Sequence, residues 1–136
     1  MEILWSGGAG WGTLALLPGA WNPPTLAHLA MAEAALAWAE TAVLVLPRTF
    51  PHKKEEGAPL GRRAEWLVEV ARRRPGIAAA WSDGGLFIEM AREARALGAQ
   101  RVLLACGRDA AERIVGWDYG AGDSIERQLA EYELLV

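Results

Sequence analysis

Short, continuous apolar runs alternate with longer segments of mixed polarity along this chain. The runs at residues 13–18 and 42–46 are almost entirely aliphatic, and each is closed by proline or glycine. Apolar runs of this length between turn residues are typical of strands that are buried on both faces of a sheet. Two shorter runs follow the same pattern. The sequence therefore predicts strands over residues 13–18, 42–46, 77–81 and 101–105.

The segments between these runs have helical periodicity. From residue 26 to about 40, apolar side chains recur roughly every 3.6 positions, with no interior glycine or proline. Residues 62–74 have an apolar face and end in a run of arginines, and positive charge suits the C-terminus of a helix. The pattern predicts helices over residues 26–40, 62–74, 86–97, 107–115 and 124–132.

The alternation of strands and helices predicts one α/β domain over residues 1–136, with a parallel sheet covered by helices on both faces. In such a sheet, ligands bind outside the carboxyl ends of the strands. We therefore expect the loops at residues 19–25, 47–56 and 106–109 to converge on one cleft.

Composition narrows the function classes. Hydrophobic residues make up 52% of the chain and charged residues 23%, which excludes disorder as its main state. The net charge of −3 argues against sequence-independent binding of nucleic acid, because that binding needs a basic surface. One cysteine allows no disulfide framework. No apolar stretch reaches about 18 residues, so we expect no membrane span. The chain has no signal-peptide pattern, so we expect a cytoplasmic protein.

A glycine cluster near the N-terminus has some features of a dinucleotide-binding fingerprint. A working fingerprint follows a strand and opens a helix. Here the cluster precedes a predicted strand, and its third glycine has the wrong spacing. We therefore interpret the glycines at positions 7, 8, 10 and 12 as a flexible hairpin or an N-terminal turn.

The segment from Gly19 to His28 follows a predicted strand and opens a predicted helix. Free backbone N–H groups at a helix start form an anion site. Thr25 and His28 lie about one helical turn apart, so their side chains face the same spot, and a hydroxyl with an imidazole can bind triphosphate oxygens there. The alternative is a threonine N-cap beside a polar histidine that binds no ligand. The spacing leaves both interpretations open.

This segment resembles the signature of the nucleotidylyltransferase superfamily, Gly-x-Phe-Asn/Asp-Pro followed by His/Thr-x-Gly-His. The signature stands here as Gly19-Ala20-Trp21-Asn22-Pro23 and Thr25-Leu26-Ala27-His28. Two further stretches are similar to motifs of nicotinate or nicotinamide mononucleotide adenylyltransferases. They are Pro51-His52-Lys53-Lys54, and Gly107-Arg108-Asp109 followed by Trp117. The three motifs occur in the family's order, and the resemblance covers most of the chain.

The resemblance implies a Rossmann-like nucleotidylyltransferase fold. It also implies an enzyme of NAD biosynthesis that transfers AMP from ATP to nicotinate or nicotinamide mononucleotide and releases pyrophosphate. Mg²⁺ would bind through the substrate phosphates rather than in a protein cage. The implied catalytic residues are Thr25, His28 and Lys53. The implied nucleotide-binding residues are Gly19, Ala20, Trp21, Asn22, Gly107 and Asp109, and the implied acceptor-binding residues are His52, Lys54 and Trp117.

Several of these residues also have purely structural interpretations. Lys53 and Lys54 suit a solvated loop, and Asp109 suits the N-terminus of a helix. Trp117 suits a core or a partner-facing position. Cys106 is better explained as a small buried apolar residue than as a nucleophile.

The chain departs from the family pattern in three places. Ala27 replaces the signature glycine, at a position where the family packs closely against the nucleoside. Residues 84–89 replace a Ser-x-Thr-rich segment that contributes to mononucleotide recognition. The C-terminal Ile-Ser-Ser/Thr-x-x-Arg segment is absent, so we expect a short domain that lacks the family's last strand and helix and is a weak catalyst. The apolar residues 134–136 invite a partner chain, which allows a homo-oligomer.

Two other functions remain open. The motif at residues 19–28 is shared with cytidylyltransferases, which would use CTP and an alcohol phosphate. The chain could also be a nucleotide-binding homologue with little or no catalytic activity.

Overall fold

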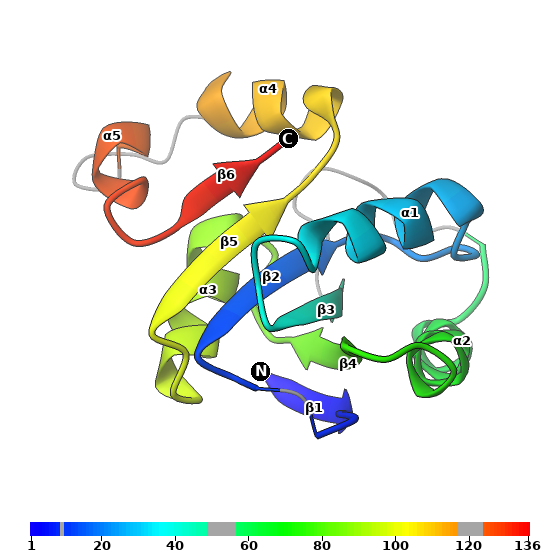
Figure 1. Ribbon diagram of the computed structural model, residues 1–136. Coiled ribbons are helices and arrows are strands. Elements are labelled where there is room, and N and C mark those ends of the chain that lie inside the picture. The colour runs from blue at the N-terminus through cyan, green and yellow to red at the C-terminus, as the bar shows by residue number, and fades with distance from the viewer. Residues whose placement is uncertain (9, 49–56, 117–123) are drawn as a thin grey trace.

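The computed structural model describes residues 1–8, 10–48, 57–116 and 124–136. Within these residues, six strands form one sheet in the order β1-β4-β3-β2-β5-β6 (Figure 1). The strands are β1 (Glu2–Trp5), β2 (Thr13–Pro18), β3 (Thr41–Pro47), β4 (Ile77–Ser82), β5 (Arg101–Ala105) and β6 (Glu133–Leu135). The helices are α1 (Leu26–Ala35), α2 (Leu60–Arg72), α3 (Phe87–Ala96), α4 (Arg108–Gly116) and α5 (Ile125–Gln128).

The predicted fold class is confirmed, because five neighbouring strands of the sheet run parallel. β2 pairs with β3 on one side and with β5 on the other, and β4 and β6 continue the parallel pairing outward. The chain therefore fills one half of the sheet before it crosses to the other half. The point of reversal lies between β2 and β5, and it is there that open α/β sheets bind ligands.

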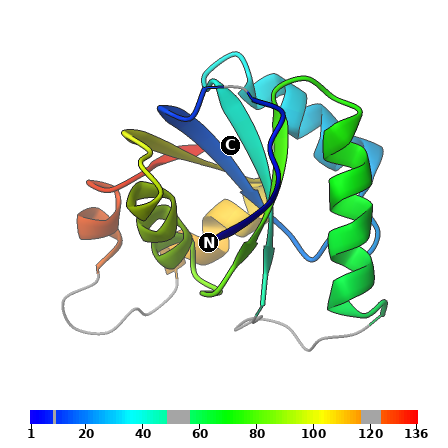
Figure 2. The same ribbon diagram turned by 90° about the horizontal axis from the view of Figure 1, so that it is seen from below.

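Helices cover both faces of the sheet. Figure 2 shows α1 and α2 on one side, and α3 with the short α5 on the other. Leu67 of α2 belongs to the first apolar core, and Ile88 of α3 belongs to the second. β3 is buried along its whole length, and its side chains belong alternately to the first and the second core, as expected for a central parallel strand. No helix in the described part of the chain is long and apolar enough to cross a membrane.

Four elements differ from the prediction. β6 was not predicted, and it pairs in parallel with β5. The helix predicted over residues 124–132 spans only Ile125–Gln128. β1 was not predicted, and it joins the sheet edge antiparallel to β4. The helix predicted to reach residue 40 ends at Ala35. No local breaker ends α1. Instead the Glu40 N–H donates to the carbonyl of Thr13, and its carboxylate accepts from the Thr13 N–H, which draws the chain back to the sheet.

The N-terminal glycine segment connects β1 to β2 at the amino edge of the sheet. The Thr41 hydroxyl donates to the carbonyl of Gly10 at 2.6 Å and fixes this segment against the start of β3. It therefore lies at the end of the strands opposite to the one where α/β sheets bind ligands. This placement agrees with an N-terminal turn and not with a dinucleotide fingerprint.

Candidate functional site

The first and third predicted loops both leave the carboxyl edge of the sheet, from neighbouring strands. β2 ends at Pro18 and β5 ends at Ala105, and the two strands are direct neighbours. α1 begins seven residues after residue 19, at Leu26, and α4 begins at Arg108. The topology thus places residues 19–25 and 106–109 on the two sides of the point where the strand order reverses. Of the second loop, residues 49–56 lie outside the described part of the chain.

Thr25 and His28 form a capping box at the start of α1. The Thr25 hydroxyl oxygen accepts from the backbone N–H of His28 at 3.3 Å, and His28 Nδ1 accepts from the backbone N–H of Thr25 at 3.3 Å. The hydroxyl and Nδ1 also lie 2.9 Å apart. The N-cap that the sequence left as an alternative is therefore present. Direct phosphate binding by Thr25 remains a prediction.

The capping box leaves other backbone donors of α1 open. The first four N–H groups of a helix have no acceptor within the helix. In α1 the capping box satisfies those of Thr25 and His28. Within the described residues, the N–H groups of Leu26 and Ala27 therefore remain for an external acceptor, and both residues are exposed. The positive end of the helix dipole lies at the same place, so an anion is favoured there.

The indole ring of Trp21 packs against the imidazole of His28. Its φ of 51° is left-handed, which is rare for a bulky residue and costs about 1–2 kcal/mol. The indole is only 2% exposed, and its Nε1–H donates to the Val45 carbonyl at 2.8 Å. The ring meets the imidazole of His28 edge-on, with centroids 4.9 Å apart. Gly19 provides the space, because a Cβ there would lie 3.1 Å from Trp21 Cε2.

A buried arginine ties the loop at residues 19–25 to α2. Arg63 is 2% exposed, and its guanidinium donates to the carbonyls of Ala58 and Ala20 at 2.7 and 3.3 Å. The Asn22 side-chain oxygen accepts from the Ala58 N–H at 3.1 Å, so the same loop is held twice. Arg63 was not among the site residues predicted from the sequence. Its signal was present, because it lies four residues before the buried Leu67 on the inner stripe of α2.

The other side of the reversal point holds Gly107 and Asp109. A Cβ at Gly107 would meet no atom of the described residues within 4 Å, so the space beside it is open to them. Asp109 lies exposed in the first turn of α4, where the helix dipole favours a carboxylate. Cys106 is buried, and burial raises the pKa of its thiol, which suits an inert apolar role.

An acidic group is held at the end of β4. Burial works against ionisation of Glu93. However, its carboxylate accepts hydrogen bonds from the α-amino group of Met1, the Ser82 hydroxyl and the Asp83 N–H. The net result is a lowered pKa for Glu93. This network fixes the β4–α3 turn.

Four predicted site residues cannot be placed. His52, Lys53, Lys54 and Trp117 lie outside the described residues. Within the described part, no three His, Cys, Asp or Glu side chains come together in a way that could hold a metal ion.

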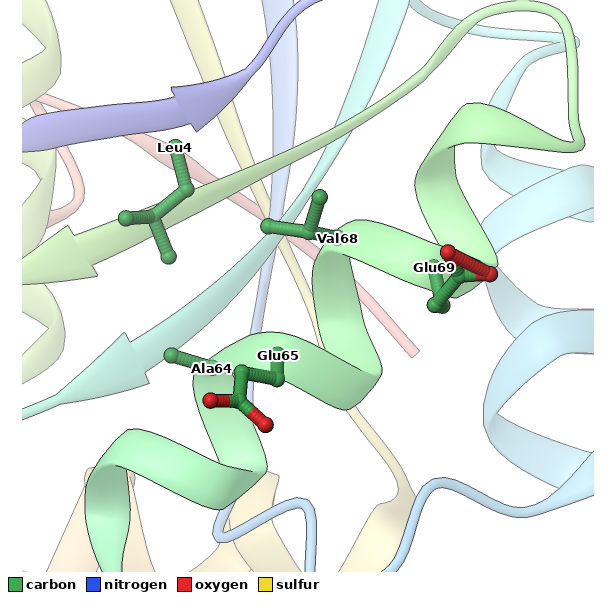
Figure 3. A pocket seen from close by; sticks show the side chains of 5 residues that line it. All are labelled: Leu4, Ala64, Glu65, Val68 and Glu69. Carbon is green, nitrogen blue, oxygen red and sulfur yellow. The ribbon is translucent and has the colours of Figure 1, made fainter.

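Two hollows in the surface involve none of the predicted site residues. One of about 360 Å³ lies between β1 and α2 and is lined by Leu4, Ala64, Glu65, Val68 and Glu69 (Figure 3). The other, of about 260 Å³, is lined by apolar residues of α1 and β6, by Trp38 and by Cys106. The first offers carboxylates and the second offers apolar surface, so neither suits a phosphate group.

Comparisons with known proteins agree with this geometry. The model of the cytidylyltransferase-like family matches residues 16–127. Two solved structures of nicotinic acid mononucleotide adenylyltransferase from Plasmodium falciparum have the same fold. The structure complexed with NaAD has a TM-score of 0.64 and 15% identity over 90% of this chain and 74% of that chain. The structure complexed with APC has a TM-score of 0.63 and 14% identity over 91% of this chain and 74% of that chain.

No curated protein matches the chain. At this low identity the two solved structures establish the fold alone. The family match spans most of the chain and includes the start of α1 and the Gly107–Asp109 segment. The chain therefore belongs to the cytidylyltransferase-like family, within the nucleotidylyltransferase superfamily.

Proposed function

We propose that this chain is an adenylyltransferase. It transfers AMP from ATP to a mononucleotide, nicotinate or nicotinamide mononucleotide, and releases pyrophosphate. The observation that carries the proposal is the start of α1. There the capping box leaves two backbone N–H groups open, and the imidazole of His28 lies beside them. A triphosphate is the anion that such a set of donors suits.

The chemistry needs positioning and charge stabilisation. A phosphate oxygen of the acceptor attacks the α-phosphorus of ATP, a new P–O bond forms, and the bond to the β-phosphate oxygen breaks. Negative charge grows on the departing pyrophosphate. Preorganised donors aimed at that charge lower the barrier and need no reorganisation during the reaction. In this chain the N–H groups of Leu26 and Ala27 and the imidazole of His28 would supply these donors.

The part of the site at the start of α4 would bind the nucleoside of ATP. Gly107 leaves open space, and Asp109 in the first turn of α4 can accept hydrogen bonds from ribose hydroxyls. Lys53 would neutralise phosphate charge. The acceptor mononucleotide would be bound by His52, Lys54 and Trp117. Mg²⁺ would enter with the triphosphate, since phosphates and water are its preferred ligands in such sites.

The experiment is a pyrophosphate-release assay with Mg²⁺ and a matrix of substrates. ATP and CTP are each combined with nicotinate mononucleotide, nicotinamide mononucleotide and an alcohol phosphate. The proposal predicts release only with ATP and a mononucleotide, and loss of that release in His28→Ala. Release with CTP and the alcohol phosphate would replace it with the cytidylyltransferase function that the family match also permits.

A binding protein without catalysis is the third outcome. It would show saturable nucleotide binding, sensitive to His28→Ala, with no pyrophosphate from any pair. Glu112→Gln is a suitable control, because Glu112 is exposed on α4 and pairs only with Arg108 within the described residues. The control should behave as the wild type in every arm.

A further inference from the structure

The imidazole of His28 is held from two sides. On one side, Nδ1 lies 3.3 Å from the backbone nitrogen of Thr25 and 2.9 Å from its hydroxyl. On the other, the ring meets the Trp21 indole edge-on at an interplanar angle of 60°. A rotation of the imidazole by half a turn would place a carbon where Nδ1 now accepts, and both bonds to Thr25 would be lost.

The bonds to Thr25 also determine where the ring proton lies. A backbone N–H can only donate, so Nδ1 must accept from Thr25. An Nδ1 that accepts carries no proton, so the Thr25 hydroxyl is the donor across the 2.9 Å contact, while its oxygen accepts from the His28 N–H. A neutral imidazole carries one ring proton. That proton is therefore on Nε2.

Trp21 cannot easily move away from the imidazole. Its ring is 2% exposed, its Nε1–H is committed to the Val45 carbonyl, and Gly19 packs closely against its Cε2, Nε1 and Cδ2 atoms. A phenylalanine at this position would keep an aromatic edge but would have no N–H to donate. The indole therefore couples the position of the His28 ring to the end of β3.

We propose that Thr25 and Trp21 are positioning residues that act through His28. Together they hold its neutral imidazole in one orientation, as the Nε2–H tautomer, so that Nε2–H donates to a phosphate oxygen of the nucleotide. The last step rests on the proposed function. The orientation and the tautomer do not, because they follow from contacts within the ligand-free protein.

The direct test is long-range ¹H–¹⁵N NMR of the histidine ring nitrogens in the ligand-free protein, with the rings neutral. The spectrum of His52→Gln assigns His28. We expect Nε2 to have the shift of a protonated nitrogen and Nδ1 that of an unprotonated one. Thr25→Ala removes the hydroxyl bond but keeps the backbone N–H, and Trp21→Leu removes the aromatic contact, so each should shift part of the population to the Nδ1–H tautomer, whereas Thr25→Ser should keep the wild-type pattern. A protonated Nδ1 or an even mixture in the wild type would overturn the proposal.

Kinetics then separate positioning from stability. Thr25→Ala should lower kcat about 10- to 100-fold, the size expected when a donor is misplaced, and Thr25→Ser should restore most of it. Ile88→Ala is the control, because it removes a buried side chain from the opposite core and leaves the tautomer unchanged. If Ile88→Ala lowers kcat as much at an equal loss of Tm, the positioning role is wrong. If the wild type has no turnover, the proposed function fails while the NMR result still decides the positioning.

Discussion

Gly19→Ala should destabilise the fold through one contact. A Cβ at this position would lie 3.1 Å from Trp21 Cε2, 3.3 Å from Nε1 and 3.4 Å from Cδ2. Carbon atoms in contact prefer about 3.5–4.0 Å, so the ring must move by several tenths of an ångström. The indole is buried and bonded to Val45, which makes that movement costly.

The magnitude follows from two opposing effects. Overpacking a tight core costs about 1–3 kcal/mol. Replacing glycine by alanine where the backbone permits it stabilises by about 0.4–1 kcal/mol through the unfolded state. The net expectation is a loss of about 1–2 kcal/mol in the free energy of unfolding. For a chain of this size, that lowers Tm by about 3–8 °C.

The assay is thermal and urea unfolding, followed by circular dichroism, of Gly19→Ala and of Gly7→Ala. Gly7 is the matched control, since a Cβ there would meet no atom of the described residues within 4 Å. Gly7→Ala should change the free energy of unfolding by no more than about 0.5 kcal/mol. Equal stability of the two variants would refute the close packing of Gly19 against Trp21.

Three further predictions follow from other contacts. Arg63→Lys should lower the free energy of unfolding by about 1–3 kcal/mol in urea unfolding, because a lysine cannot donate to both carbonyls that Arg63 binds. The same variant should weaken nucleotide binding. Unchanged nucleotide binding would show that Arg63 does not position the site. Ala27→Gly should tighten nucleotide binding in calorimetry and lower Tm slightly, since it opens space and reduces helix propensity; weaker binding would count against the site. The pKa of Glu93 is lowered in the folded state, so the stability it contributes is present above its ordinary value of 4.5 and is lost as pH falls through the folded value. Urea unfolding as a function of pH should show this loss, and Glu93→Gln should flatten it; an equally steep profile in that variant would rule out Glu93 as its source.

The central strands were predictable because their signal is local. The strands at residues 13–18 and 101–105 have the predicted bounds, and those at 42–46 and 77–81 gain only end residues. Buried parallel strands are continuous apolar runs, and such runs stand out between turns and helices. The alternation with helices then fixed the fold class and the carboxyl edge.

The parts that were missed depend on distant residues. β1 is four residues long and pairs with β4, which lies far along the chain, so its short apolar run was not enough to identify it as a strand. α1 stops at Ala35 because Glu40 bonds back to Thr13. Part of the site also depends on contacts between residues that are distant in the sequence. Spacing placed Thr25 and His28 together, but it could not show that Trp21 is left-handed and bonded to Val45.

The most direct test of the account is a calorimetric titration of ATP with Mg²⁺ into the wild-type chain and into His28→Ala. We expect saturable binding to the wild type and its loss in the variant, because the triphosphate is bound at the start of α1. Equal binding to both would place the nucleotide elsewhere. No binding to the wild type would contradict the claim that the capping box and its two open N–H groups form a triphosphate site.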